Sequence, residues 1–591
     1  MKIKIIIVSA GLWLVLIGTS VCFGYGKDTH EEISRQAFNN SIVAQLIAQG
    51  KLQDIGLTDT GTGTTFYEGK THDGQVHSKT IIDWVAQGGY DEDEPFTRSL
   101  NHFYDPITGN GLLIFCPSLN WGLGLCTQIY SYKDAVQYYF DGLTNSSISG
   151  RSKSLANAFY SLGHVIHLIQ DLAQPQHTRL DMHPPWNSSL YEDWSDNFRK
   201  KLPFAGYTPV YPSNSSVFYS VTKFWKAGNG IYGDGLAEFS NHNFVSAGTN
   251  FTSNKYVYPL LLPTGSQDIS ILDICNPLKN SNPGDAWICG NDPIPNNLLN
   301  AWSQLNPAPV LGFFSTTVEG PSVPANTINQ RASTLSIFDP DLVKLNQKQA
   351  FTLNRFNFAS AQQFLIPRAV AYSAGLINYF FRGSMDASLD ANGNLIIKNT
   401  SSEDMVGTFT LYYDDANDVR KDVVSKTGLT IGTNKTGSLG SFSPPTSPAP
   451  KEPGKYILVF NGKMGQEQNA VSGRIIHICS NVISDDFNGS SLNSSIWTSP
   501  VGSSCVSVGG GVLNVSGYPC YPTDGDPQHK SLMSIQTFTP SNSEVKASAR
   551  IYINGNYQGF GFSSFSSSFF SSLSPYFSIY FDTYDNISGN K

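Results

Sequence analysis

Residues 167–177 read HLIQDLAQPQH and contain two histidines and an aspartate at fixed separations. His167 and Asp171 are four residues apart, so on a helix their side chains point from the same face. Pro175 predicts that this helix ends just past Asp171, with His177 folding back from the turn that follows. Two imidazoles and a carboxylate brought to one place are good zinc ligands.

The histidines of the chain are concentrated near its N-terminus. Of the 11 histidines, eight lie in the first 192 residues, namely His30, His72, His77, His102, His164, His167, His177 and His183. This distribution predicts that any metal chemistry belongs to the N-terminal third of the chain.

Length and composition limit the possible classes of protein. A chain of 591 residues is too long for one hydrophobic core, which predicts two to four domains. The net charge of −8 and the 14% of charged residues disfavour a strongly basic nucleic-acid surface, although a local one stays possible. The 12% of aromatic residues, 53 glycines and 32 prolines are typical of secreted, loop-rich, β-containing proteins.

The first 24 residues have the pattern of a secretory signal peptide. Lys2 and Lys4 precede an apolar run, and the sequence Cys22-Phe-Gly24 offers a cleavage site. The alternative is an uncleaved membrane anchor. No later segment is apolar and long enough to span a bilayer, so we expect a secreted or periplasmic protein.

Seven cysteines would remain after cleavage, and six of them are close in sequence as pairs: Cys116/Cys126, Cys275/Cys289 and Cys505/Cys520. In an exported protein such spacing predicts local disulfides that close surface loops. Metal ligation by cysteine is the weaker alternative, because no C-x-x-C spacing occurs.

Apolar residues recur at helical spacing in three segments, 28–50, 152–173 and 345–382. Asp28 and Glu31 suit a capping arrangement at the start of the first segment. In the third segment Pro367 predicts a kink or a restart of the helix, and Gly383 predicts its end. Residues 205–335 are rich in Pro, Asn, Gly and Ser and predict long loops and short helices.

The pattern changes after residue 394 to short β-branched or aromatic segments such as NLIIKN, GTFTLYY and KYILVFNG. A second β region opens at DDFNGSSLNSSIW and has too few strands for a full sandwich, so the sequence given is expected to be cut short. The fold class predicted is multidomain, with a mostly α-helical domain followed by two all-β, sandwich-like domains. The predicted boundaries are 1–24 (signal peptide), 25–388 (helical, with a loop-rich insertion at about 205–335), 389–480 (small all-β) and 481–591 (β-sandwich).

The stretch HLIQDLAQPQH, preceded by SLGHVI and followed by TRLD and YEDW, resembles the zinc-dependent phospholipase C and single-strand-specific nuclease superfamily. The spacing H-x3-D-x5-H matches that family. The helix pattern LIPRAVAYSAGLINYFFRG resembles the final helix of its bacterial members. The resemblance covers roughly residues 25–385 and implies a helical domain that hydrolyses phosphodiesters with two to three zinc ions.

The resemblance also implies ligands outside the central stretch. Cleavage after Gly24 leaves Tyr25 first, and family members bind a metal with the α-amino group and carbonyl of residue one, usually Trp, together with a nearby histidine such as His30. In GGYDEDEPFTRSLNHFYDP, Asp93 and His102 resemble the early aspartate and histidine ligands.

The late ligands fit the family pattern less completely. Glu192 in SLYEDW resembles the family's late glutamate. The family's histidine four residues before that glutamate is replaced by Ser188, so His183, nine residues upstream of Glu192, is carried over as a substitute. The implied metal ligands are therefore Tyr25, His30, Asp93, His102, His167, Asp171, His177, His183 and Glu192.

The chemistry of such a site follows from its ligands. Asp171, flanked by two histidines, is the natural bridging carboxylate. A metal pair about 4 Å apart can generate hydroxide near neutral pH and clamp a phosphodiester during in-line attack. Asp93 is the candidate catalytic residue, because it could also orient the attacking water as a general base. The alternative for each residue is a structural polar contact or a solvated side chain, and for His183 we favour that alternative. His164, three residues before His167, is expected to support a ligand or to be satisfied in the core.

The C-terminal β region implies a different activity. DDFNGSSLNSSIW followed by GGGVLNVSG resembles the start of a concanavalin-like jelly roll, as in lectins. No E-x-D-x-x-E is present, so only binding of a glycan or cell-surface ligand is suggested, by analogy of fold.

Together these patterns predict a secreted zinc-dependent phosphodiesterase of phospholipase C type that acts on a phospholipid or another phosphodiester. A zinc-dependent nuclease is the alternative enzyme, disfavoured because the composition offers no basic groove. The alternative of another class is a non-catalytic surface- or glycan-binding protein that keeps its metals for folding.

Overall fold

The computed structural model of the chain divides by its internal contacts into two units, Met1–Ile476 and His477–Lys591. The helical and small all-β domains predicted from the sequence thus lie within one unit. The described residues are 26–58, 66–183, 189–198, 220–228, 235–246, 249, 261–276, 278, 289–290, 295–305, 310–316, 330–335, 351–355, 357–390, 392–452, 454–478, 506–509, 512–515, 531–533, 559–564 and 577–582.

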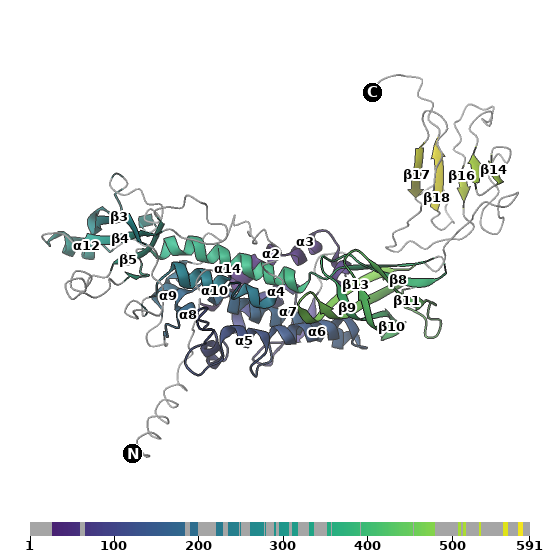
Figure 1. The fold of residues 1–591 in the computed structure, drawn as a ribbon, viewed down its shortest axis with the longest axis horizontal. Coiled ribbons are helices and arrows are strands. Elements are labelled where there is room, and N and C mark those ends of the chain that lie inside the picture. Colours follow the sequence, from purple (N-terminus) through teal and green to yellow (C-terminus); the bar gives the residue numbers. More distant parts are fainter. Residues whose placement is uncertain are drawn as a thin grey trace, which may run out of the picture. The chain divides into compact units, whose positions relative to one another are not determined.

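The first unit begins with a helical region (Figure 1). Its helices are α2 (Lys27–Asn39), α3 (Ile42–Ala48), α4 (Ile81–Asp91), α5 (Ser118–Leu123), α6 (Tyr132–Thr144), α7 (Ile148–Asp171), α8 (Pro175–Thr178), α9 (Leu190–Phe198), α10 (Leu236–Asn243), α12 (Asn296–Ser303) and α14 (Phe358–Phe380). Short 3-10 helices are η1 (Leu52–Ile55), η2 (Phe96–Asn101), η5 (Val221–Phe224) and η7 (Ile271–Asp273). No helix among the described residues is both long and apolar enough to cross a membrane.

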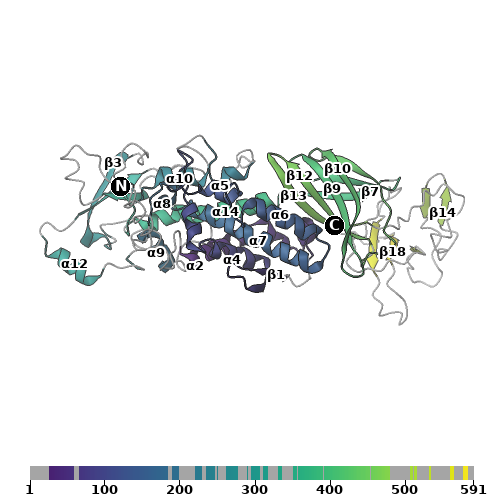
Figure 2. The ribbon, with the colours of Figure 1, turned by 90° about the horizontal axis from the view of Figure 1, so that it is seen from below.

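Helix α7 lies at the centre of this region, packed against α4, α6 and α14 (Figure 2). Its residues are buried continuously from Ala158 to Asp171, as expected for a helix covered on all sides. The backbones of α4 and α7 approach very closely, because a Cβ on Gly163 would lie 2.2 Å from the carbonyl oxygen of Val85. This close approach places His167, four residues after Gly163, with its Nδ1 2.7 Å from the carbonyl oxygen of Gly89 near the end of α4.

The predicted helices are present with shifted bounds. The segment 28–50 is two helices, α2 and α3, because the Ser41 side chain accepts a hydrogen bond from Ala44 N and starts a new helix there. The expected cap by Asp28 and Glu31 is wrong, since Gly26 is the N-cap of α2 and no side chain caps it. Helix α14 continues through Pro367 and ends at Phe380, before Gly383.

The region 205–335, predicted as loops and short helices, also contains strands, and the prediction is wrong in that respect. A four-stranded antiparallel sheet with the order β3-β4-β5-β6 is formed by β3 (Leu261–Ser270), β4 (Val310–Thr316), β5 (Gln330–Leu335) and β6 (Phe351–Thr352). The strands were not predicted because Gly, Pro and Asn are abundant in the connecting segments, and the β-forming runs between them, such as VLGFFST, are short. A small hairpin of β1 (Tyr67–Lys70) and β2 (Val76–Lys79) lies elsewhere in the first unit.

The first unit ends in two antiparallel sheets, in the region where the small all-β domain was predicted. Their orders are β10-β9-β12-β13 and β11-β8-β7. The strands are β7 (Met385–Leu389), β8 (Asn394–Asn399), β9 (Met405–Asp414), β10 (Arg420–Ile431), β11 (Thr436–Ser441), β12 (Lys455–Met464) and β13 (Glu467–His477). Arg420 Nη1 donates to the carbonyl of Leu143 at 2.5 Å, and Arg474 Nη1 to Asp54 Oδ1 at 2.8 Å, which connects these sheets to the helices.

The second unit contains only β-strands among its described residues. β14 (Val506–Gly509) pairs with β15 (Val512–Val515), and a three-stranded sheet has the order β16-β18-β17. These three strands are Ser531–Met533 (β16), Gly559–Ser564 (β17) and Phe577–Asp582 (β18). The opening motif DDFNGSSLNSSIW lies outside the described residues, so the likeness to a concanavalin-type sandwich stays a prediction.

Two of the three predicted disulfides are present. Cys116 is bonded to Cys126 and Cys275 to Cys289. The pair Cys505/Cys520 and the residual Cys479 lie outside the described residues, as does the predicted signal peptide.

Candidate metal centre

The last turn of α7 carries His167 and Asp171, and the helix ends at Asp171, as the position of Pro175 predicts. Pro175 begins the short helix α8, which carries His177. Asp171 Oδ2 lies 3.3 Å from His167 Nε2 and 3.8 Å from His177 Nδ1. The quoted stretch of sequence therefore places two imidazoles around one carboxylate.

Helix α2 contributes the third side chain of a first cluster, formed by His30, His167 and Asp171. His30 Nε2 lies 3.3 Å from Asp171 Oδ1. The rings of His30 and His167 are stacked with their centroids 3.6 Å apart. All three side chains are fully buried.

A second cluster contains Asp93, His102 and His167. His102 Nδ1 lies 3.5 Å from Asp93 Oδ1 and 2.8 Å from Asp171 Oδ2. His167 Nε2 lies 3.8 Å from Asp93 Oδ2. His167 belongs to both clusters, and Asp171 of the first cluster contacts His102 of the second, so the two clusters lie side by side.

A third cluster contains His177, His183 and Glu192. Glu192 Oε1 lies 2.9 Å from His183 Nε2 and 3.6 Å from His177 Nε2. The structure thus places His183 beside Glu192 and His177, and ligation by His183 stays a prediction. Ser188 lies outside the described residues.

These separations suit metal ions with nitrogen and oxygen ligands. Two ligands of a tetrahedral zinc ion, each at 2.0–2.1 Å, lie about 3.3 Å from each other. The first cluster has His30 and His167 each 3.3 Å from an Asp171 oxygen. His167 Nε2, His177 Nδ1 and both Asp171 oxygens make no hydrogen bond of acceptable geometry with any described group. Buried polar atoms that converge without hydrogen bonds fit a cation between them.

The opposite ring nitrogens of the histidines are held by hydrogen-bond acceptors. His30 Nδ1 lies 2.6 Å from Gln170 Oε1, His167 Nδ1 lies 2.7 Å from the carbonyl of Gly89, and His183 Nδ1 lies 2.8 Å from the carbonyl of Asp181. A proton on Nδ1 leaves the Nε2 lone pair directed at the cluster. Such outer contacts fix the tautomer and ring orientation that a metal ligand needs.

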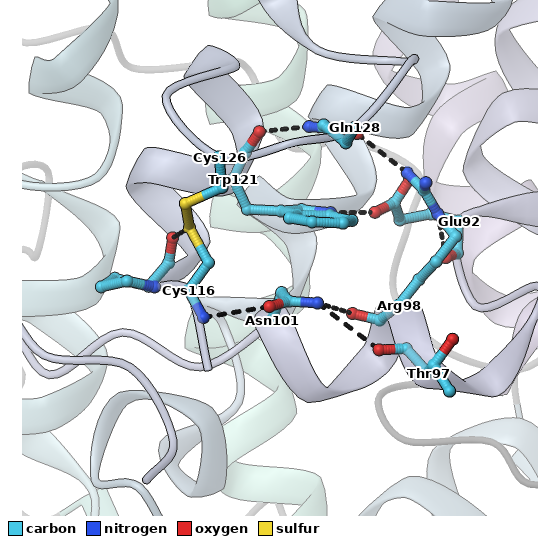
Figure 3. The surroundings of a disulfide bond; sticks show 9 residues. Glu92, Thr97, Arg98, Asn101, Cys116, Trp121, Cys126 and Gln128 are labelled. Atoms are coloured by element: carbon cyan, nitrogen blue, oxygen red, sulfur yellow. Dashed lines mark hydrogen bonds and ion pairs between the residues drawn. A yellow bond between two sulfur atoms is a disulfide. The ribbon is translucent and has the colours of Figure 1, made fainter. Parts of the chain in front are cut away.

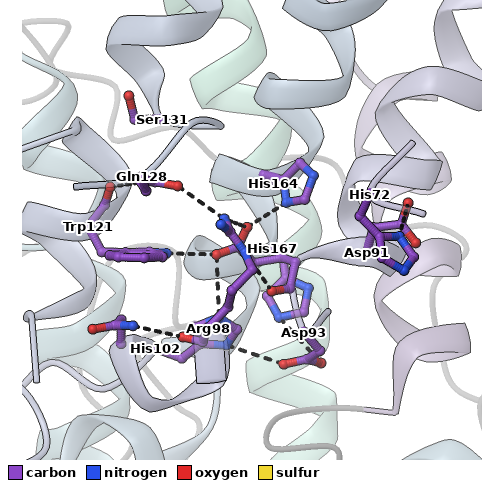
Figure 4. A network of polar contacts seen from close by, with 12 residues as sticks. His72, Asp91, Asp93, Arg98, His102, Trp121, Gln128, Ser131, His164 and His167 are labelled. Atoms are coloured by element: carbon purple, nitrogen blue, oxygen red, sulfur yellow. Dashed lines mark hydrogen bonds and ion pairs between the residues drawn. The ribbon is translucent and has the colours of Figure 1, made fainter. Parts of the chain in front are cut away.

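Glu92 is a buried member of this region that the sequence analysis missed. It accepts hydrogen bonds from Trp121 Nε1 at 2.8 Å and from Arg98 Nη2 at 2.5 Å (Figure 3). His164 Nδ1 lies 2.5 Å from Glu92 Oε2, and His102 Nε2 lies 3.5 Å from Glu92 Oε1 (Figure 4). Glu92 therefore stands behind His102, on the side away from Asp171, and His164 supports Glu92 rather than joining a cluster.

Burial and charge oppose each other in this site. Burial disfavours ionisation, yet the charges of His177, His167 and His102 hold the pKa of Asp171 well below its usual range. Burial likewise disfavours protonation of His102, but Asp171 raises the pKa of His102 to about 10. The Glu192 charge raises the pKa of His183 to about 9 against the same effect of burial. Without a metal, Asp171 and Glu192 thus each face a histidine with a raised pKa, His102 and His183 respectively.

The third cluster lies nearest the solvent. His183 and Glu192 are each 5% exposed, whereas the other six side chains of the clusters are fully buried. The next residue to His183, Met182, is 50% exposed. His183 and Glu192 therefore lie on the most exposed side of the three clusters.

One sequence-predicted ligand, Tyr25, lies outside the described residues. Its neighbour Gly26 is the N-cap of α2, one turn before His30, and its carbonyl accepts from His30 N at 3.1 Å. Ligation by the backbone of Tyr25 stays a prediction.

No protein-family description and no curated protein matches the chain. Among solved structures, the crystal structure of an alpha-toxin of Clostridium perfringens from the avian strain SWCP aligns with 78% of this chain and 99% of its own. The sequence identity is 9% and the TM-score is 0.23. A superposition of this quality carries no argument about fold or activity, so the functional conclusion rests on the site itself.

Proposed function

We propose that the chain is a zinc-dependent phosphodiesterase with phospholipase C-like activity. The observation that carries the proposal is the convergence of eight buried side chains into three adjoining clusters around Asp171. Nitrogen and carboxylate ligands of this kind suit zinc, and three clusters suit two to three ions.

Each part of the site would have its own task. Zinc in these clusters would act as a Lewis acid and lower the pKa of a water molecule from about 15.7 to about 7. Asp171 would hold two ions at once, because its two oxygens face different histidines. Asp93, close to His102 and His167, would orient the attacking water and accept its proton. The buried walls would keep bulk water from the reacting phosphate.

A phospholipid is the preferred substrate on grounds of charge. Only 14% of the residues are charged and the net charge is −8, which does not favour a polyanionic nucleic acid. A zinc-dependent nuclease is the second candidate, because the same clusters would cleave any phosphodiester that reached them. The proposal also includes a glycan or cell-surface ligand for the C-terminal β region. It further includes secretion or periplasmic export, because the disulfides Cys116–Cys126 and Cys275–Cys289 fit an oxidising compartment.

The test is elemental analysis of protein refolded with zinc, followed by turnover assays on phosphatidylcholine and on single-stranded DNA. We expect two to three zinc ions per chain and release of phosphocholine. Cleavage of DNA alone would favour the nuclease, and full metal content without turnover on either substrate would favour a non-catalytic protein. Less than one zinc ion per chain would refute the metal site.

The variant Asp171→Asn should lose activity and at least one zinc ion, because an amide cannot bridge two cations as a carboxylate does. Asp415→Asn is the matched control. Asp415 is 3% exposed and accepts backbone hydrogen bonds from Asn417 and Val419 in the β region, with no histidine beside it. A fully active Asp171→Asn protein would show that the site is misassigned.

A further inference from the structure

Four large aliphatic side chains are exposed on one short segment, Gly111–Tyr130, which we call the disulfide loop. They are Leu113 (76% exposed), Ile114 (95%), Leu125 (71%) and Ile129 (60%). Single exposed apolar residues are ordinary on a soluble protein, whereas a group of them marks a surface that meets a partner or a membrane.

The loop is built to present these side chains rather than to bury them. Leu113 has a positive φ of 51°, which a residue with a branched side chain adopts only when its surroundings require it. Its neighbour Leu112 is 3% exposed, so the chain turns from the core to the surface at this point. The disulfide Cys116–Cys126 joins the two halves of the loop at a Cα–Cα distance of 6.6 Å and so keeps Ile114 and Leu125 on the same part of the surface.

The base of the loop is attached to the candidate metal centre. Cys116 N donates to Asn101 Oδ1 at 3.0 Å, and Ser118 N donates to the carbonyl of Phe103 at 2.9 Å. Asn101 and Phe103 are the two neighbours of His102 in sequence. The Phe103 ring stacks on His177, with centroids 4.5 Å apart, and lies 5.7 Å from the His183 ring. The exposed tip is therefore held by the residues that adjoin the second and third clusters.

The absence of charged side chains from the disulfide loop indicates what kind of partner it binds. No Asp, Glu, Lys, Arg or His occurs between Asp105 and Lys133, and Asp105 is fully buried. A surface that bound anionic lipid by charge would carry several Lys or Arg side chains. A stable protein interface uses about 20–30 residues a side, with a charged or polar rim. Four aliphatic side chains without charge suit the acyl region of a zwitterionic lipid surface.

We propose that the disulfide loop inserts Leu113, Ile114, Leu125 and Ile129 into a neutral phospholipid surface and so sets the metal centre against its substrate. This inference rests on the proposed phospholipase function. Two further apolar side chains are exposed next to members of the third cluster: Met182, 50% exposed beside His183, and Leu190, 74% exposed two residues before Glu192.

The test is flotation of the zinc-loaded full chain with vesicles of pure phosphatidylcholine, which reports binding whether or not the lipid is cleaved. We expect Ile114→Asp to weaken vesicle binding about tenfold or more, because the new carboxylate must leave water to enter the lipid. Leu125→Asp should do the same, and Ile114→Leu should bind as the unchanged protein does. The control is Ile148→Asp. Ile148 is 61% exposed at the first residue of α7, about 18 Å along that helix from Tyr160, where Tyr130 of the loop makes contact, so its replacement should not change binding.

Salt and lipid composition give a second measurement. Binding should be the same from about 0.1 M to about 1 M sodium chloride and should not increase when anionic phosphatidylglycerol is added, because the loop carries no charge. Flotation of Ile114→Asp equal to that of the unchanged protein would overturn the proposal. Binding that needs anionic lipid, or apolar association of the chain with itself in place of vesicle binding, would also overturn it.

The outcome is separable from that of the enzymatic proposal. Vesicle binding that depends on Ile114, without hydrolysis of phosphatidylcholine, would support the docking surface and contradict the phospholipase assignment. Hydrolysis of phosphatidylcholine vesicles that is equal in Ile114→Asp and the unchanged protein would support the enzyme and contradict the docking surface.

Discussion

Replacing Glu92 by glutamine tests whether a residue that belongs to none of the three clusters, but lies behind His102, controls the metal centre. Four donors face this carboxylate: Trp121 Nε1, Arg98 Nη2 and the ring nitrogens of His164 and His102. An ionised carboxylate can accept from all of them, because it offers about four lone-pair sites and no hydrogen. A glutamine has one acceptor oxygen and an NH2 group, so at least one of these donors would face another donor.

The effect on metal binding follows from the position of His102. When His102 Nδ1 faces the cluster with its lone pair, the remaining ring proton lies on Nε2 and points at Glu92, 3.5 Å away. An amide NH2 at that place favours the opposite tautomer, with the proton on the side of the metal. Loss of such an outer carboxylate weakens zinc binding about 10–100-fold, which corresponds to about 1.4–2.7 kcal/mol for the ion beside His102.

The free energy of unfolding should fall as well, by an amount that depends on the hydrogen bonds and ring contact that Arg98 keeps in the variant. Removing one partner of a buried ion pair costs about 3–5 kcal/mol. Arg98 keeps hydrogen bonds to Gln128 Oε1 and to the carbonyl of Glu92, and it lies over the ring of Trp121 at 5.1 Å. We therefore expect a loss near the lower end of that range, about 3 kcal/mol.

The control for Glu92→Gln is Glu467→Gln. Glu467 pairs with Arg382 at 2.8 Å and with the hydroxyl of Tyr132, but it has no histidine beside it. Both variants should melt at a lower temperature. Only Glu92→Gln should lose zinc in competition with a chromophoric chelator and change the visible spectrum of the cobalt-substituted protein. Equal zinc affinity and an unchanged cobalt spectrum in Glu92→Gln would refute the argument.

Three further predictions concern protons, the N-terminus and the shared core. Zinc uptake by the metal-free protein should release protons at pH 7, and zinc affinity should increase toward pH 9. The reason is that the pKa values of about 10 for His102 and about 9 for His183 leave both rings protonated until the metal displaces the proton. Calorimetry in buffers of different ionisation heat measures the protons released, and uptake without proton release would contradict the prediction. One extra residue before Tyr25 should cost a metal ion, since it displaces the α-amino group by more than about 3 Å; equal metal content of both forms would argue against backbone ligation. A fragment of residues 25–388 should melt at a lower temperature and bind a hydrophobic dye, since the helical core continues into buried side chains such as Ile457 of β12; a fragment as stable as the full chain would contradict this.

The parts of the site that the sequence predicts are those set by local geometry. A four-residue separation on a helix and a proline just after it are enough to place His167, Asp171 and His177 together. His30, Asp93 and His102 were reached through the family resemblance, because nothing in their local sequence shows which distant helix they will meet. The close approach of α4 and α7, which brings Asp93 to His167, depends on packing at Gly163 and could not be derived from spacing.

The acidic run Asp91–Glu94 shows why Glu92 was missed while Asp93 was found. Four consecutive acids begin at Asp91, the last residue of α4, and spacing alone cannot tell which of them turn inward. In the structure three of these acids are buried, and each has different partners. Asp91 contacts Tyr160 and His72, Glu92 contacts Arg98 and His164, and Asp93 belongs to the second cluster. Burying three neighbouring carboxylates is costly unless each is paired. The usable signal was therefore the nearby Arg98 in an otherwise weakly charged segment, because an arginine that is buried four residues after the end of an acidic run needs one of those acids as its partner.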